Sequence, residues 1–181
     1  MNYEPRPLPE DVQRLCTKLN CPPLLFSHLT LVFDVSVDLV HKLRQKFPDL
    51  EFDHEAVCFG AATHDFGKIQ HSNELTGPGC QHEVAGPALL KEHGVEPRLS
   101  RFTRTHGSWL QEELPLEDLL VALADCVWKG QRLEELERQV IGRIATQTNS
   151  EQWEVFSKLD GLLEEITAQG DERLAWQQKE G

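Results

Sequence analysis

The stretch Ala61–Lys68 places an imidazole, His64, directly before a carboxylate, Asp65, where a helix of small residues is expected to end. Adjacent helical residues point about 100° apart, so the two side chains cannot both face a core, but both can reach one ion beyond the helix end. A metal ion would also stabilise a carboxylate that follows an apolar run, because burying it unpaired is costly. Taken alone, such a pair is better explained as a solvated helix end, with Gly67 as the cap and Lys68 countering the helix dipole.

A second carboxylate and several histidines lie on or next to helical stretches that are otherwise apolar. Asp125 interrupts the run 116–129, which is apolar nearly all round. His28 begins a helical stripe that continues through Val32 and Val35. The candidate ligands that share such a position are His28, His64, Asp65, His82, His106 and Asp125. Imidazole and carboxylate ligands mixed in this way suit Mn, Fe, Zn, Ni or Co rather than Ca or a thiolate site.

Apolar residues recur with helical periodicity along most of the chain, so we expect an all-α fold. Residues 24–47 contain no Gly or Pro, and although their alternating pattern also fits a strand, a run of 24 residues is too long for one. Asp53 is a good N-cap for a helix over residues 54–66, and the polar stretch 69–80 is expected to be a functional loop. Further helices are predicted over residues 8–19, 81–93, 97–105 and 116–129, and then along the apolar stripes Leu133–Ile144 and Trp153–Ile166.

Length, cysteine content and charge narrow the class of protein. With 181 residues the chain is most simply a single domain. Its five cysteines are odd in number and form no C-x-x-C pair, which fits a reducing cytoplasm. The N-terminus has no signal-peptide pattern and no apolar run approaches the ~20 residues of a membrane span, so we expect a soluble, cytoplasmic protein without a membrane partner. The net charge of −12 argues against binding to nucleic acid, because phosphate neutralisation dominates that affinity.

Five segments follow one another in an order known from a protein family: Ser27-His28-Leu29, AATHDFGKI, CQHEVAGPALLKEHG, FTRTHGSW and LLVALADCVWKG. Together they resemble the HD-domain phosphohydrolase superfamily over about residues 24–130. The resemblance implies a helical bundle around a metal site. We therefore expect one domain over residues 1–181, in which additional C-terminal helices over about 131–168 and a polar, mobile tail over 170–181 follow the HD-like core.

The resemblance also implies the metal ligands. A first metal would be bound by His28, His64, Asp65 and Asp125. Asp65 would bridge to a second metal, whose further ligands would be His82 and His106. A one-metal site stays open, because Pro87 interrupts the helix that carries His82. Some relatives also have paired histidines where this chain has His106 followed by Gly107.

The chemistry that follows from these ligands is metal-assisted hydrolysis. A bound divalent metal lowers the pKa of water from near 16 towards about 7 and so supplies hydroxide at neutral pH. Asp65 would act as a general base as well as a ligand, and Lys68 would be the catalytic cation that holds a phosphate oxygen. Arg104 and Lys129 lie behind it as further substrate-binding candidates, and His71 is a candidate substrate contact from the loop. For the three cations, a solvated helix-end position is an equal alternative.

The leading hypothesis is a metal-dependent phosphohydrolase that acts on a small phosphorylated compound, a nucleotide, with one or two divalent ions of Mn, Fe, Co, Ni or Zn. Two branches of the family are disfavoured. The alarmone hydrolases carry Glu-Asp three residues after their His-Asp pair, whereas here Gly67-Lys68-Ile69 follows Phe66. The cyclic-dinucleotide branch carries Gly-Tyr-Pro, whereas the only tyrosine here is Tyr3. The alternatives are a metal-dependent nuclease, a di-iron oxygenase and a non-catalytic ligand-binding module. The oligomeric state stays open, a homodimer included.

Overall fold

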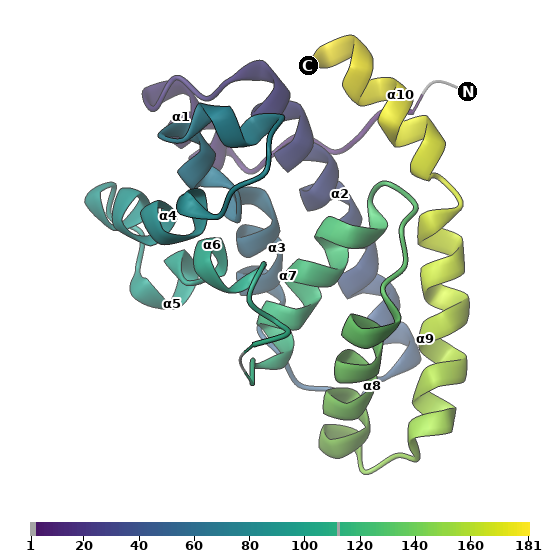
Figure 1. Ribbon diagram of the computed structural model, residues 1–181. Helices are drawn as coiled ribbons and strands as arrows, with labels where there is room; N and C mark the ends of the chain where they lie inside the picture. Colours follow the sequence, from purple (N-terminus) through teal and green to yellow (C-terminus); the bar gives the residue numbers. More distant parts are fainter. Residues whose placement is uncertain (1–2, 112) are drawn as a thin grey trace.

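The protein is built from helices in the computed structural model, which describes residues 3–111 and 113–181 (Figure 1). No strand occurs in those residues, so the expected all-α fold is confirmed. The α-helices are α1 (Glu10–Lys18), α2 (Pro23–Lys46), α3 (His54–Thr63), α4 (Gln81–Glu92), α5 (Pro97–Ser100), α6 (Phe102–Thr105), α7 (Leu116–Val127), α8 (Glu134–Thr148), α9 (Gln152–Thr167) and α10 (Gly170–Glu180). Two short 3-10 helices, η1 (Phe66–Ile69) and η2 (Ser72–Leu75), lie between α3 and α4.

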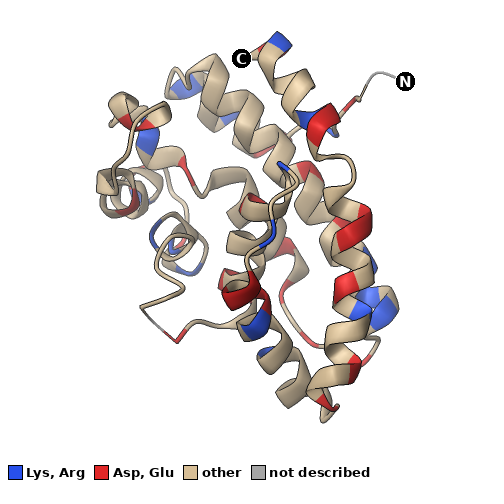
Figure 2. Ribbon diagram, turned by 45° about the vertical axis from the view of Figure 1, so that its right-hand side comes forward, with Lys and Arg blue, Asp and Glu red and all other residues tan. Residues whose placement is uncertain are grey.

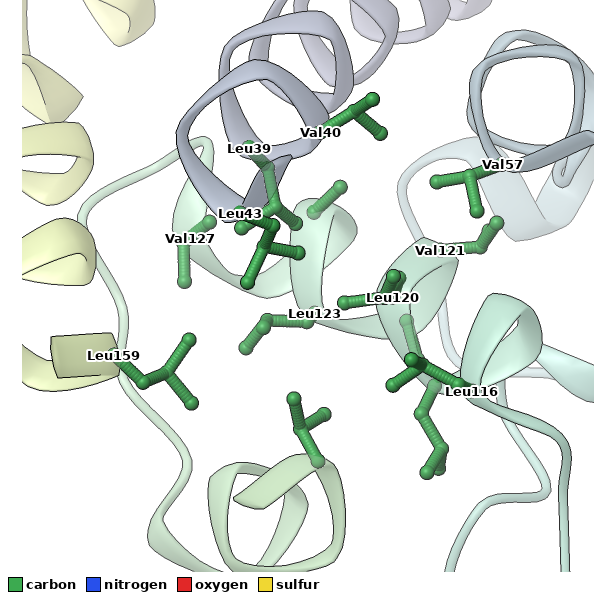
Figure 3. Packing of buried hydrophobic residues seen from close by; sticks show 14 of the residues in the cluster. Leu39, Val40, Leu43, Val57, Leu116, Leu120, Val121, Leu123, Val127 and Leu159 are labelled. Atoms are coloured by element: carbon green, nitrogen blue, oxygen red, sulfur yellow. The ribbon is translucent and has the colours of Figure 1, made fainter. Parts of the chain in front are cut away.

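α2 is a central helix of the core. It begins at Pro23, where the missing backbone N–H costs nothing, and then runs for 24 residues because no later Gly or Pro interrupts it. It contacts α3, α7, α9 and α10. Leucine and valine side chains from α2, α3, α7 and α9 point toward one another in the core (Figure 3). The predicted helix over residues 24–47 is therefore confirmed, and the strand reading is wrong.

α2 is also long and apolar enough to cross a membrane by length and composition alone, with a mean hydropathy of 1.5 in its most apolar window. This finding corrects the expectation that no apolar run approaches the length of a span. Within the protein 61% of that window is buried, and the core helix of a folded domain passes the same test. Length and hydropathy are therefore weak grounds for a membrane assignment here.

α3 packs closely against two other helices because it is made of small residues. The Asp53 side chain caps its first turn by accepting a hydrogen bond of 2.9 Å from the backbone N–H of Ala56, as predicted. A Cβ atom at Gly60 would lie 2.6 Å from Phe102 Cγ and 2.8 Å from Val121 Cγ2. Only glycine therefore lets α3 approach α6 and α7 this closely.

The chain leaves α3 at Thr63 rather than at Phe66, where the helix was expected to end. His64 still has helical torsion angles, φ −51° and ψ −34°, whereas Asp65, with φ −99° and ψ 11°, turns the chain into η1. This change of helix type lies between the two residues of the central pair. It is what allows two neighbouring side chains to reach the same site.

The segment 97–105, predicted as one helix, is divided into α5 and α6 at Arg101. Arg101 Nη2 lies 2.9 Å from Asp118 Oδ2, and Asp118 of α7 is fully buried. Thr105 Oγ1 donates a hydrogen bond of 2.6 Å to the same carboxylate. This buried polar cluster fixes α6 against α7, and with it the position of His106, which directly follows α6.

α8 and α9 confirm the two predicted amphipathic helices and pack against each other and against α7. The buried face of α9 is formed by Val155, Leu159 and Leu162. Trp153 and Phe156, expected on the apolar stripe, remain 68% and 52% exposed. The reason is the helical rotation of about 100° per residue, which turns both away from the face that Val155 defines.

The chain ends in a helix, α10, where a mobile polar tail was expected. Arg173, only 1% exposed, donates a hydrogen bond of 2.7 Å to the Ile166 carbonyl and a longer one of 3.4 Å to the Trp128 carbonyl. Its Nε donates to the Tyr3 hydroxyl at 3.0 Å. These bonds hold α10 in place, and it packs on α2 (Figure 1).

Candidate metal centre

Three helices bring ligand-type side chains together: α2 carries His28, the end of α3 carries His64 and Asp65, and α7 carries Asp125. His28 Nε2 lies 3.2 Å from His64 Nε2 and 3.3 Å from Asp65 Oδ2. Asp125 Oδ1 lies 3.3 Å from His28 Nε2 and 3.5 Å from His64 Nε2. Ligand atoms of His28, His64 and Asp65 all lie within 4.8 Å of one another, so the group could hold a metal ion.

A second group forms on the other oxygen of the same carboxylate. Asp65 Oδ1 lies 3.3 Å from Nε2 of His82, on α4, and 3.5 Å from Nε2 of His106. The ligand atoms of these three residues also lie within 4.8 Å of one another. Asp65 thus contributes one oxygen to each of two groups that could hold a metal ion.

Two of the imidazoles are oriented by backbone carbonyl groups. His64 Nδ1 lies 2.9 Å from the Ala61 carbonyl oxygen. His106 Nδ1 lies 3.2 Å from the Phe102 carbonyl oxygen. A carbonyl oxygen only accepts, so both Nδ1 atoms donate and carry the proton. The lone pair of each imidazole is therefore on Nε2, the atom that faces Asp65.

The distances between donor atoms match those of ligands on a shared cation. Nitrogen and oxygen ligands bind such ions at about 2.0–2.2 Å, which places two of them roughly 2.8–3.6 Å apart at angles of about 90–110°. The contacts among His28, His64 and Asp65 range from 3.2 Å, between His28 and His64, to 3.6 Å, between His64 and Asp65. Two buried atoms, Asp65 Oδ1 and His82 Nε2, have no hydrogen-bond partner among the described residues. A cation between them would satisfy both, so the residues fit a metal.

The two carboxylates dominate the electrostatics of the site. Burial disfavours protonation of His28, but hydrogen bonds to Asp125 and Asp65 outweigh burial and raise its pKa to about 9. Burial would raise the pKa of Asp65, but the surrounding histidines, His64 first, hold it well below its usual value. The pKa of Asp125 is likewise held well below its usual value against burial, by His64 and His28. Both carboxylates are therefore ionised at neutral pH, and a cation and a proton compete for His28 Nε2.

Comparison with protein families gives a match to the HD domain over residues 25–127, more than half of the chain. The chain belongs to the HD-domain family. The match runs from α2 to the end of α7, which includes all the residues of both groups, and it confirms the resemblance drawn from the sequence motifs. HD-domain proteins are generally metal-dependent phosphohydrolases. No curated protein and no solved structure matches the chain.

In the HD-domain site, Gly67 lets η1 lie directly on α4. A Cβ atom at Gly67 would lie 2.0 Å from the carbonyl oxygen of His82 and 2.8 Å from its Cα, so the two backbones touch. Gly67 is not the left-handed cap that the solvated helix end would need. Pro87 was expected to kink or divide the helix of His82, but α4 continues through it, and His82 is buried and faces Asp65.

Of the four residues expected to contact substrate, Lys68 lies beside His64 and Asp65. Its Nζ donates a hydrogen bond of 2.6 Å to Asp65 Oδ2, and both residues line a pocket of about 230 Å³. Arg104 is exposed on α6, and Lys129 is half-buried just after α7. His71 directly precedes η2. None of the last three lines the pocket, so their contacts with substrate stay predictions.

Glu74, in η2, belongs to the site but was missed by the sequence reasoning. Its carboxylate accepts a hydrogen bond of 2.6 Å from His82 Nδ1 and bonds of 3.1 Å from the backbone N–H groups of Gln81 and His82. These contacts put the proton on Nδ1 and turn Nε2 toward Asp65, so Glu74 acts through His82. The one signal in the sequence is that Glu74 is the only Asp, Glu, Lys or Arg in residues 69–80.

Replacing Glu74 by glutamine is expected to weaken metal binding at His82 and to leave the group around His28 intact. Glutamine keeps the volume, but its neutral oxygen accepts more weakly from Nδ1 and its NH₂ group cannot accept from the backbone. Loss of such an outer partner lowers metal affinity about 10–100-fold. Calorimetric titration with Mn²⁺ should show one site weakened by this factor and one unchanged.

Glu92→Gln, an exposed position at the end of α4, is the matched control and should bind metal like the wild type. Unchanged affinity at both sites in Glu74→Gln would contradict the positioning role. A wild-type protein that binds one ion and no more would contradict the second group itself.

Proposed function

We propose that this HD-domain protein is a metal-dependent phosphohydrolase that cleaves a phosphate ester of a small molecule, a nucleotide, with two divalent transition metal ions. The observation that carries the proposal is the position of Asp65, whose two oxygens lie 3.3–3.6 Å from imidazole nitrogens of two separate groups. The proposed ligands are His28, His64, Asp65 and Asp125 for one ion, and Asp65, His82 and His106 for the other. Mn, Fe, Co, Ni and Zn all accept imidazole and carboxylate ligands, and are the proposed metals.

The side chains of the site have different roles in the proposed hydrolysis. Divalent ions, when bound, supply Lewis acidity and lower the pKa of water from near 16 towards about 7. Lys68, whose side chain is 21% exposed at the pocket, would donate a hydrogen bond to a phosphate oxygen while still contacting Asp65. Asp65 was expected to act as a general base as well. Although burial opposes the shift, the surrounding histidines keep the pKa of Asp65 so low that it is a weak base, which favours the ligand role.

A small phosphorylated substrate fits the charge of the protein better than nucleic acid does. The net charge is −12, and Lys and Arg lie scattered among acidic residues in the view of Figure 2. A nuclease would need an extended basic surface to hold the phosphate backbone. A single phosphate group needs only the local positive charge of the metal ions and Lys68. We propose that the whole chain works as one domain, with α8, α9 and α10 packed around the family core.

The proposal is tested by reconstituting metal-free protein separately with Mn, Co, Ni and Fe. Each preparation would be assayed with 4-nitrophenyl phosphate, bis(4-nitrophenyl) phosphate and a panel of nucleotides, and its metal content measured. We expect about two ions per chain and ester hydrolysis that disappears when a chelator removes them.

Other outcomes separate the alternatives. A fully reconstituted protein that holds no metal would overturn the proposal. Oxygen consumption by the ferrous protein without ester hydrolysis would favour the oxygenase reading. Metal and nucleotide binding without turnover of any ester would favour a non-catalytic ligand-binding module.

A further inference from the structure

The pocket of about 230 Å³ beside the metal groups is completed by a helix from outside the family core. His28 and Asp65 line this pocket together with Lys68. Gln177, on α10, lines it as well. The family match ends at residue 127, so α10 lies outside the part of the chain that is shared with the family. A helix that the family match does not include therefore reaches the site where the phosphate ester is proposed to bind.

Gln177 offers this pocket a polar group without a partner. Its side chain is half-buried and makes no hydrogen bond to any residue in the described part of the chain. A side-chain amide both donates and accepts, so it can recognise either kind of polar group. The leucines beside it in the pocket can do neither. Gln177 is therefore the residue of α10 that can form a hydrogen bond with a ligand in the pocket.

The position of Gln177 is fixed by contacts on both sides along α10. Arg173, one turn earlier, is buried and bonds to the carbonyl oxygens of Ile166 and Trp128. At the other end, a Cβ atom at Gly181 would lie 2.9 Å from Ser27 Oγ, so the end of the chain rests on α2 next to His28. These contacts fix the backbone of α10 at Gln177, so no ordering of the helix is needed when a ligand binds there.

The other walls of the pocket restrict the kind of ester that fits. They are mostly apolar: Leu24 and Leu25 of α2, Leu75 of η2, and the ring of Trp128, whose buried Nε1 has no hydrogen-bond partner among the described residues. Lys68 is the only lysine or arginine among the residues described as lining the pocket, so it matches one phosphate group rather than a chain of phosphates. The volume is below the roughly 300–1,000 Å³ of common ligand pockets, which favours a compact organic group.

We propose that α10 forms the specificity wall of the substrate pocket, with Gln177 as the residue that selects the substrate. The substrate class is a monophosphate ester, such as a nucleoside 5′-monophosphate, in which an apolar ring face of the organic group packs against the leucines and a hydrogen-bonding group meets the Gln177 amide. This inference rests on the proposed function and adds that α10 determines the specificity for different esters.

The test compares Gln177→Leu with Gln178→Leu in the full-length, metal-loaded protein. Leucine keeps the approximate volume of glutamine and removes its hydrogen bonds, and Gln178 is the exposed neighbour on the same helix, which does not line the pocket. The substrates are phenyl phosphate, which lacks a polar group beyond the phosphate, and the nucleoside 5′-monophosphates. Gln177→Ala serves as a second variant, and thermal melting checks that all three variants fold.

The expected result is a change in preference rather than a general loss. Gln177→Leu should lower kcat/KM about threefold to tenfold for at least one nucleoside monophosphate, the cost of one neutral hydrogen bond, and change phenyl phosphate less than about twofold. Gln178→Leu should change neither. An equal effect of Gln177→Leu on all the esters, or no effect on any, would overturn the proposal.

A binding measurement separates this inference from the proposed function. Dissociation constants of the same monophosphates would be measured by calorimetry for the wild type and the variants. If the wild type binds a monophosphate but hydrolyses none, the proposed function is overturned. The role of Gln177 in substrate selection is still supported in that case if Gln177→Leu weakens the binding. If the wild type hydrolyses esters, and the variants bind and turn over every monophosphate as the wild type does, the role of Gln177 is overturned and the proposed function is supported. If it neither binds nor hydrolyses any, both fail.

Discussion

Asp65→Asn should remove bound metal from both groups and lower kcat/KM at least about a thousandfold. The reason is that Asp65 belongs to both groups: its Oδ2 lies 3.3 Å from His28 Nε2 and its Oδ1 lies 3.3 Å from His82 Nε2. One substitution therefore alters both groups. Asparagine keeps the shape, but it has no negative charge, and its NH₂ group would point a donor at one of the two groups. No other single substitution in the site should have so large an effect.

The measurement for Asp65→Asn is metal content together with the melting temperature in the presence and absence of Mn²⁺. The wild type should be stabilised by Mn²⁺, by about 2.7 kcal/mol for each bound ion at a concentration 100 times its dissociation constant. The variant should show no such gain. Asp49→Asn, an exposed carboxylate in the turn after α2, is the control and should behave like the wild type. Wild-type activity in Asp65→Asn would rule out the assignment of the site.

Gly67→Ala should destabilise the fold and separate the two metal groups. The new Cβ atom would lie 2.0 Å from the His82 carbonyl oxygen and 2.6 Å from its carbon, and these are backbone atoms that cannot rotate away. Either η1 or α4 must move, so His82 Nε2 loses its place 3.3 Å from Asp65 Oδ1. We expect a loss of about 3 kcal/mol in the free energy of unfolding, or roughly 6–12 °C in melting temperature, and loss of the ion at His82.

Gly142→Ala is the matched control for this substitution. Nothing lies within 4 Å of a Cβ atom at Gly142, which is inside α8. Alanine there should stabilise the helix by about 0.5–1 kcal/mol, because it loses less conformational freedom on folding than glycine does. The two variants can be compared by thermal melting and by metal titration. A Gly67→Ala protein as stable as the wild type, with both ions bound, would show that η1 and α4 do not need their close contact.

Much of the fold and part of the site could be predicted from local sequence signals. The Gly- and Pro-free run before Phe47 predicted α2, and Asp53 predicted the start of α3, because helix length and capping depend on neighbouring residues. The apolar run around Asp125 marked that carboxylate as anomalous, and His28 lies on the same buried helix that its stripe indicated. Joining these residues into one site required the family resemblance, since nothing local relates positions so far apart in the chain.

Other features depend on contacts between distant segments, and only the tertiary structure decided them. Glu74 looked like an ordinary loop residue until its carboxylate was seen 2.6 Å from His82 Nδ1. Arg173 looked like part of a polar tail, because helical periodicity reports an apolar face and gives no sign of a buried arginine bonded to carbonyl oxygens. The sequence by itself determined that His64 and Asp65 stand together at a helix end. The family resemblance implied that Asp65 would bridge to His82 and His106, but only the packing of α4 and α6 around that end decided that both imidazoles face Oδ1, because the direction of a side chain follows from the helices that pack against it.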